Sequence, residues 1–153
     1  MHSLELKVPP AALTLLLALA MWGATFVVPS VELPFVVRAI AAVVLIVVGA
    51  GISLSGVVSF RRARTTVNPT KPNSTSTLVK TGIYRVTRNP MYLGFLLILL
   101  GWAAFLSNVL ARVGAFAFVP YMNRFQISPE ESALSAMFGA EFSAYKSTVR
   151  RWL

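Results

Sequence analysis

The chain has 153 residues, of which 56% are hydrophobic and only 12% are charged. A soluble domain is typically about one-quarter charged, so this balance indicates an integral membrane protein. The chain has no cysteine, which excludes disulfides and thiolate metal sites, and its single histidine, His2, argues against His-based catalysis and against a transition-metal site. Most cations flank apolar segments, so membrane topology explains the formal charge of +9 better than nucleic-acid binding does.

Residues 1–60 predict two transmembrane helices. The first uncharged run lies between Lys7 and Glu32, is long enough to cross about 30 Å of hydrocarbon, and lacks the cleavage region of a signal peptide. The second lies between Arg38 and Arg61. Its small residues would let another helix approach closely; they are Gly49, Gly51, Ser53, Ser55 and Gly56.

Residues 91–123 predict a short helical hairpin. The apolar run is interrupted by the sequence SNVLAR, residues 107–112, which we interpret as a turn. The two arms have about 16 and about 13 residues, or about 24 and 20 Å of helix. Both arms are short for a full crossing of the bilayer.

The basic residues predict one orientation in the membrane. The loop 61–90 holds seven of them: Arg61, Arg62, Arg64, Lys71, Lys80, Arg85 and Arg88. Four more follow the hairpin: Arg124, Lys146, Arg150 and Arg151. We therefore expect one all-α integral membrane domain, residues 1–153, with about four passes in the cell inner membrane and both termini in the cytoplasm. No ionisable residue lies well inside a span, which argues against a transport pathway.

Residues 128–153 predict an amphipathic cytoplasmic helix and tail. Ser128 and Pro129 are a good helix start, and Ser128 with Glu131 would form a capping box. Glu131 also lies in the middle of an apolar stripe, which consists of Leu134, Phe138, Phe142, Tyr145 and Val149. A carboxylate there is costly unless a loop arginine or a cationic ligand pairs with it. Capping alone and capping with a function both remain open.

Two motifs resemble those of a known superfamily. The sequence TGIYRVTRNPMYLG, residues 81–94, is followed after the hairpin by a Glu-Glu pair and by FGAEFSAY, residues 138–145. Together they resemble the isoprenylcysteine carboxyl methyltransferase and phospholipid methyltransferase superfamily of integral membrane enzymes. The matching positions are Gly82, Tyr84, Arg88, Pro90, Tyr92, Gly94, Glu130, Glu131, Phe138, Gly139 and Tyr145. The resemblance covers residues 61–153.

The resemblance implies a methyltransferase that uses S-adenosylmethionine, with a site formed by the loop before Met91 and the helix after Ser128. It implies catalytic roles for Arg88 and Glu131. The implied cofactor-binding residues are Tyr84, Arg88, Asn89, Pro90, Tyr92, Glu130, Glu131 and Tyr145. Each position also has a structural interpretation. Asn89 and Pro90 could serve merely to start a helix, with Asn89 as its cap, and Tyr92 could anchor at the membrane interface. For Gly94, Phe138 and Gly139 we favour a packing role.

The sequence leaves two lipidic methyl acceptors as alternatives. The leading hypothesis is O-methylation of an isoprenylcysteine-like carboxylate. Asn89 stands where many isoprenylcysteine enzymes have His, which makes N-methylation of an aminophospholipid such as phosphatidylethanolamine the alternative. Phe142 stands where Tyr is common, so a hydroxyl contact there is absent. A third hypothesis, from another class, is a non-catalytic protein whose basic loop binds anionic lipid or a partner.

Overall fold

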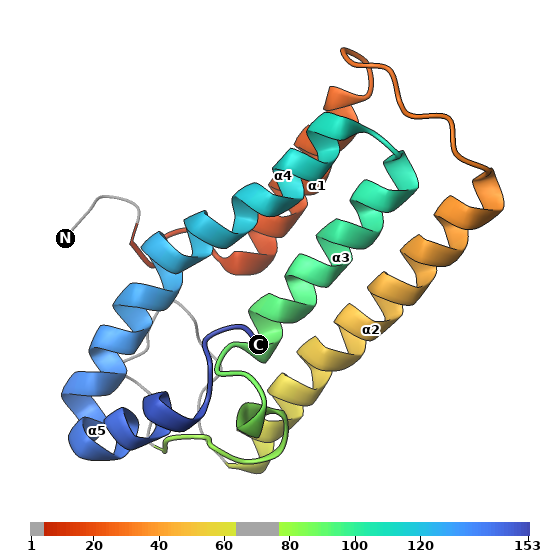
Figure 1. Ribbon diagram of the computed structural model, residues 1–153. Helices are drawn as coiled ribbons and strands as arrows, with labels where there is room; N and C mark the ends of the chain where they lie inside the picture. The colour runs from red at the N-terminus through yellow and green to blue at the C-terminus, as the bar shows by residue number, and fades with distance from the viewer. Residues whose placement is uncertain (1–4, 64–76) are drawn as a thin grey trace.

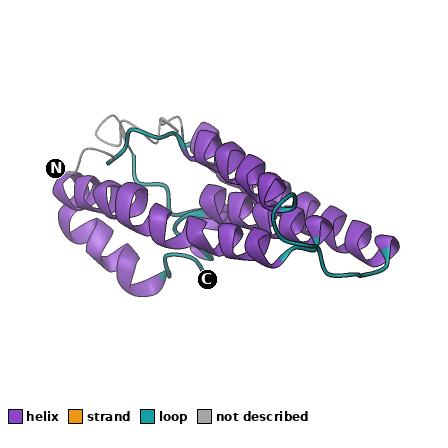
Figure 2. Cartoon of the chain, turned by 90° about the horizontal axis from the view of Figure 1, so that it is seen from above, coloured by secondary structure: helices purple, strands orange, loops and turns teal. Residues whose placement is uncertain are grey.

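The computed structural model describes residues 5–63 and 77–153, and within these ranges it contains helices and loops but no strand (Figures 1 and 2). The α-helices are α1 (Pro10–Ala24), α2 (Phe35–Arg62), α3 (Pro90–Leu106), α4 (Val109–Tyr121) and α5 (Ser128–Thr148). A 3₁₀ helix, η2 (Gly82–Arg85), precedes α3, and a π-helix, η3 (Met122–Ile127), joins α4 to α5. The all-α prediction is therefore confirmed for the described residues. His2, Arg64 and Lys71 lie outside them.

Helix α2, with 28 residues, is the one helix in the described ranges that is both long and apolar enough to cross a membrane. Helix α1 has only 15 residues and is shorter than the predicted first span. It ends because the backbone N–H groups of Thr25 and Phe26 bond back to Trp22 and Gly23 in a turn, and Pro29 follows. The number of passes stays a prediction.

The hairpin of α3 and α4 is confirmed, with arms of 17 and 13 residues. Ser107 ends α3 in the left-handed conformation, with φ of 51°. The Asn108 side chain then caps α4 by accepting hydrogen bonds from the N–H groups of Leu110 and Ala111, at 3.0 and 3.2 Å. Asn108 Nδ2 also donates to the Val28 carbonyl at 2.6 Å, which fastens this turn to the α1–α2 loop.

Helices α2 and α3 pack through small residues, as predicted. A Cβ on Gly94 would collide with the Ser53 hydroxyl and the Gly49 carbonyl, and a Cβ on Gly49 would lie 2.6 Å from the Gly94 carbonyl. Ser53 Oγ donates to the Met91 carbonyl at 3.0 Å across the same contact. Gly51 does not belong to this interface, because a Cβ there would meet nothing within 4 Å. The close approach fixes the start of α3 against α2.

The predicted capping box at Ser128 is wrong, because the chain is already helical there. Ser128 has φ of −62° and ψ of −45°, and its hydroxyl donates to the Asn123 carbonyl at 2.7 Å instead of accepting from Glu131. Helix α4 runs through η3 into α5 without a break. Pro129 has no N–H for the carbonyl of Phe125, four residues earlier, and the backbone N–H of Leu6 donates to that carbonyl at 3.1 Å. The amino-terminal segment thus stabilises a helix that a proline would otherwise interrupt.

Helix α5 is kinked at Gly139, where φ is 49° and ψ is −118°. A Cβ on Gly139 would meet nothing within 4 Å, so the packing role expected for it is wrong, and glycine is needed for its backbone conformation. The predicted apolar stripe is confirmed as a cluster. Its buried members are Phe142, Tyr145 and Val149, against which Leu78, Leu134 and Phe138 pack. Packing is therefore confirmed for Phe138.

Figure 1 shows that the start of α1, the end of α2, η2, the start of α3 and all of α5 lie at one end of the bundle. The carboxyl-terminal helix is therefore at the same end as the described parts of the basic loop, residues 61–63 and 77–90, as the positive-inside pattern requires. Which side of a membrane this end faces stays a prediction.

Candidate functional site

The site lies where three segments meet: the loop before α3, the junction of η3 with α5, and the tail after α5. Arg88 and Glu131, for which the resemblance implies catalytic roles, are in direct contact. Arg88 Nη2 lies 3.0 Å from Glu131 Oε1, and both side chains are only 12% exposed. Arg88 Nη1 also donates to the Lys146 carbonyl at 3.2 Å, near the negative end of the α5 dipole. A loop arginine thus pairs with Glu131, which is one of the two ways in which we expected the cost of burying its carboxylate to be offset.

A second arginine, Arg151, completes the pairing of Glu131. Its Nη2 lies 2.7 Å from Oε2 of Glu131, and its Nε donates to Oε1 at 3.2 Å. Both oxygens of the Glu131 carboxylate therefore accept hydrogen bonds from guanidinium groups. Arg88 Nε, in contrast, is buried with no hydrogen-bond partner in the described structure.

Glu130 has different surroundings from its neighbour. Tyr92 donates its hydroxyl proton to Glu130 Oε1 at 2.5 Å, and Gln126 Nε2 donates to the same oxygen at 2.6 Å. Burial raises the pKa of Glu130 to about 7, and the nearby Glu131 adds to the increase, while the two hydrogen bonds oppose it. Tyr92 is 5% exposed, so the alternative of an interfacial anchor is wrong. The two adjacent glutamates are thus held by different chemistry.

Asn89 and Pro90 start α3, but not by the expected capping. Pro90 occupies the first helical turn, as predicted, whereas the Asn89 side chain makes no capping hydrogen bond. Asn89 Nδ2 donates instead to the Arg151 carbonyl at 2.9 Å. The buried Thr87 accepts from the Asn89 N–H at 3.2 Å and donates to the same Arg151 carbonyl at 3.3 Å. The helix start is therefore tied to the carboxyl-terminal tail.

Tyr84 and Tyr145 join the loop to α5. The Tyr145 hydroxyl donates to the Tyr84 carbonyl at 2.7 Å, and the Tyr84 ring packs edge-on against Phe60 at 5.4 Å between centroids. Burial raises the pKa of Tyr145 to about 12 and that of Tyr84 still further above its usual value of 10, so both stay protonated near neutral pH. These tyrosines act as neutral hydrogen-bonding groups.

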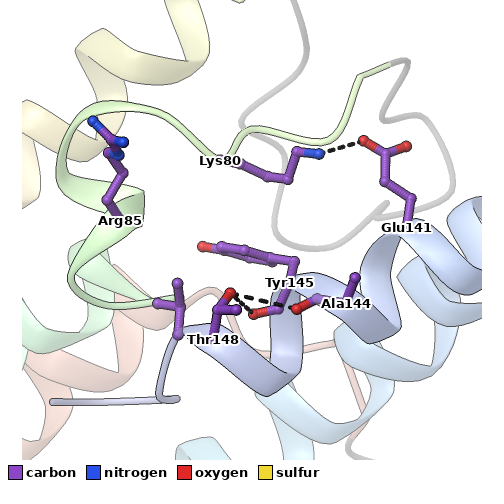
Figure 3. Close-up of a pocket in the computed structure, with 7 residues that line it drawn as sticks. Lys80, Arg85, Glu141, Ala144, Tyr145 and Thr148 are labelled. Atoms are coloured by element: carbon purple, nitrogen blue, oxygen red, sulfur yellow. Dashed lines mark hydrogen bonds and ion pairs between the residues drawn. The ribbon is translucent and has the colours of Figure 1, made fainter.

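An open pocket of about 490 Å³ lies beside Tyr145 (Figure 3). Lys80 and Glu141 form an ion pair of 2.7 Å at its edge, and Arg85 lies on the loop side. Among the predicted site residues, only Tyr145 lines this pocket. The Arg88–Glu131 contact therefore does not form this pocket.

All eight predicted site residues lie at one end of the bundle. Five of them make the polar contacts described above: Arg88 with Glu131, Tyr92 with Glu130, and Asn89 with the Arg151 carbonyl. Three partners were missed: Gln126, Thr87 and Arg151. Gln126 was detectable, since it lies four residues before Glu130 and thus on the same helix face. No group of three or more His, Cys, Asp or Glu that could hold a metal ion occurs in the described ranges.

Comparison with known proteins assigns the chain to a family. The model of the phospholipid methyltransferase family matches residues 37–141, which is more than half of the chain. An uncharacterised protein of Haemophilus influenzae is 51% identical over 63 residues, which are 41% of this chain and 100% of that protein. The protein-S-isoprenylcysteine O-methyltransferase of Saccharomyces cerevisiae is 40% identical over 83 residues, which are 52% of this chain but only 34% of the yeast protein.

No solved structure matches the chain. These matches agree with the resemblance seen in the two motifs. The family model is that of phospholipid methyltransferases, and the yeast relative is named as an isoprenylcysteine methyltransferase. The chain therefore belongs to the phospholipid methyltransferase family of integral membrane methyltransferases.

Proposed function

We propose that the chain is an S-adenosylmethionine-dependent methyltransferase that acts on a lipidic acceptor at the cytoplasmic face of the inner membrane. The first candidate acceptor is an isoprenylcysteine-like carboxylate, which would give a methyl ester. The observation that carries the proposal is the contact of Arg88 with Glu131, beside the contact of Tyr92 with Glu130. Both contacts join the two motifs at the end of an apolar helix bundle, where a lipid could reach them.

The residues present fit the cofactor. S-adenosylmethionine carries a carboxylate, an ammonium group, a ribose diol, an adenine and a sulfonium. The buried Nε of Arg88 has no acceptor in the described structure, and a ligand carboxylate would supply one. Glu130 has no cationic partner among the described residues, so it is the better candidate for the ammonium or the diol. Glu131 is less available, because two arginines already occupy its oxygens.

The chemistry needs little beyond positioning. The cofactor supplies an activated methyl group, which is transferred by in-line displacement, so orientation and exclusion of water can provide most of the rate acceleration. A carboxylate acceptor already carries its nucleophilic oxygen and needs no base. Arg88 and Arg151 would attract such an anionic acceptor to the site.

The second candidate acceptor is the amine of an aminophospholipid. An amine must lose a proton before or during methyl transfer, and the pKa of about 7 makes Glu130 a suitable proton acceptor near neutral pH. Asn89 cannot take this proton as a histidine could, because an amide does not titrate, so the role falls to a glutamate.

Methyl transfer by the purified protein tests the proposal. We expect S-adenosylmethionine to bind in detergent solution, as measured by calorimetry, and radiolabelled methyl to pass either to farnesylcysteine analogues or to an aminophospholipid. A base-labile product identifies an ester, and a base-stable label in a headgroup identifies an amine.

Variants of the two contacting residues locate the site. R88A and E131Q should each weaken cofactor binding about tenfold or more, while E141Q, a glutamate of the same helix that pairs with the exposed Lys80, should leave it unchanged. Thermal unfolding confirms that each variant is folded. Binding that persists in both site variants would place the cofactor elsewhere. Binding of anionic vesicles with no cofactor binding would support the non-catalytic alternative.

A further inference from the structure

The tail after α5 is held against the site by hydrogen bonds from several directions. The Arg88 backbone N–H donates to the Arg150 carbonyl at 3.0 Å. The Asn89 side chain donates to the Arg151 carbonyl at 2.9 Å, and Trp152 Nε1 donates to Asn123 Oδ1 at 3.0 Å. The tail lies beyond residues 37–141, the part that the family model matches. Its role must therefore be inferred from its contacts in this chain.

The two arginines that pair with Glu131 do so unequally. Arg151 makes two hydrogen bonds, one to each carboxylate oxygen, through Nε and Nη2. Arg88 makes only one, from Nη2 to Oε1. This two-point arrangement fixes the orientation of the Glu131 carboxylate. Because Arg151 supplies most of the pairing, Arg88 keeps an Nε that does not bond to Glu131.

We propose that Arg151 is a positioning residue, which anchors Glu131 so that the Arg88 guanidinium stays available for the carboxylate of the cofactor. This inference rests on the proposed function. Without Arg151, Arg88 is the only cation that the described structure places on Glu131, and it would turn to pair with both oxygens. Its Nε would then no longer be available to a ligand. Arg151 would act through Arg88 and Glu131 without touching the cofactor.

A pair of ligands that differ only in the carboxylate tests this role. Decarboxylated S-adenosylmethionine lacks the group that Arg88 would bind. We expect R151Q to weaken the binding of S-adenosylmethionine at least tenfold in calorimetry, and to change the binding of the decarboxylated analogue less than twofold. R150Q is the matched control, since Arg150 is exposed and its side chain has no recorded contact in the described structure. It removes the same charge and should change neither affinity.

Each outcome has one meaning. If the wild-type protein binds no S-adenosylmethionine, the proposed function itself fails. If it binds and R151Q binds equally well, the inference on Arg151 alone is overturned. An equal loss for both ligands would also overturn it, because a merely structural residue would affect them alike. Should R151Q fail to unfold cooperatively, R151K carries the same comparison: its single ammonium cannot hold both oxygens, so we expect severalfold weaker binding of S-adenosylmethionine alone. Wild-type affinity, or equal loss for both ligands, would refute the inference.

Discussion

The site contains two adjacent glutamates whose surroundings divide their possible work. Glu131 accepts hydrogen bonds from two guanidinium groups, whereas Glu130 accepts them from the neutral side chains of Tyr92 and Gln126. Burial without a cation raises the pKa of Glu130 to about 7. Two carboxylates with such different partners suit different tasks, one that fixes an electrostatic network and one that exchanges a proton.

The raised pKa of Glu130 predicts a pH-dependent stability. Below a pH of about 4.5, the usual pKa, the group is protonated in both the folded and the unfolded chain, so folding does not have to bury a charge. As the pH rises through about 7, the folded chain must bury the carboxylate, so this stability is lost. Each unit of pKa shift corresponds to about 1.4 kcal/mol. The melting temperature of the wild-type protein should therefore fall between pH 5 and pH 8 by more than that of E130Q.

The exposed Glu141 provides the control for this measurement, because E141Q removes a carboxyl group from the same helix. Melting temperatures in detergent at both pH values give the difference. Parallel pH dependence in the wild type and in E130Q would contradict the assigned burial of Glu130.

At the scale of the elements, sequence patterns predicted the features that depend on neighbouring residues alone. The turn at Ser107 and Asn108, and the stripe that packs Phe142 and Tyr145, follow from spacing and from side-chain capping ability. The capping box at Ser128 failed because the preceding helix did not stop. A π-helical stretch and a backbone hydrogen bond from Leu6, far away in the sequence, keep it continuous, and no pattern around Ser128 encodes that bond.

The contact between α2 and α3 predicts a contrast between two glycines. G94A would force a methyl group into the Ser53 hydroxyl and the Gly49 carbonyl, both of which belong to the tightly packed α2. Overpacking of this kind costs roughly 1 to 3 kcal/mol. G51A, in the same helix pair but with nothing within 4 Å, should be neutral or slightly stabilising, because alanine is the better helix former. Thermal unfolding in detergent measures both. Equal stability of the two variants would refute the close approach of the helices.

At the scale of the whole molecule, the sequence predicted that the two motifs meet at one end of the bundle, but it did not identify the tail as part of the site. Residue type and the order of the motifs predicted four site residues, Arg88, Tyr92, Glu130 and Glu131. Arg151 was noted only as a basic residue of the tail, since its partner Glu131 lies 20 residues away and is reached by a chain reversal after α5. Reversals of this kind depend on tertiary contacts, such as that of Trp152 with Asn123, which periodicity does not encode.

The arrangement of the ends predicts the topology in a membrane. The loop between α1 and α2 lies at the opposite end of the bundle from α5 (Figure 1). Because most of the described basic residues lie at the α5 end, that end should face the cytoplasm. The chain has no native cysteine, so single substitutions give clean probes. In intact cells that express the protein, a membrane-impermeant maleimide should label S30C, in the exposed α1–α2 loop, but should label S143C, at an exposed position of α5, only after the cells are permeabilised. Labelling of both before permeabilisation, or the reverse pattern, would refute this orientation, whatever the outcome of the cofactor experiments.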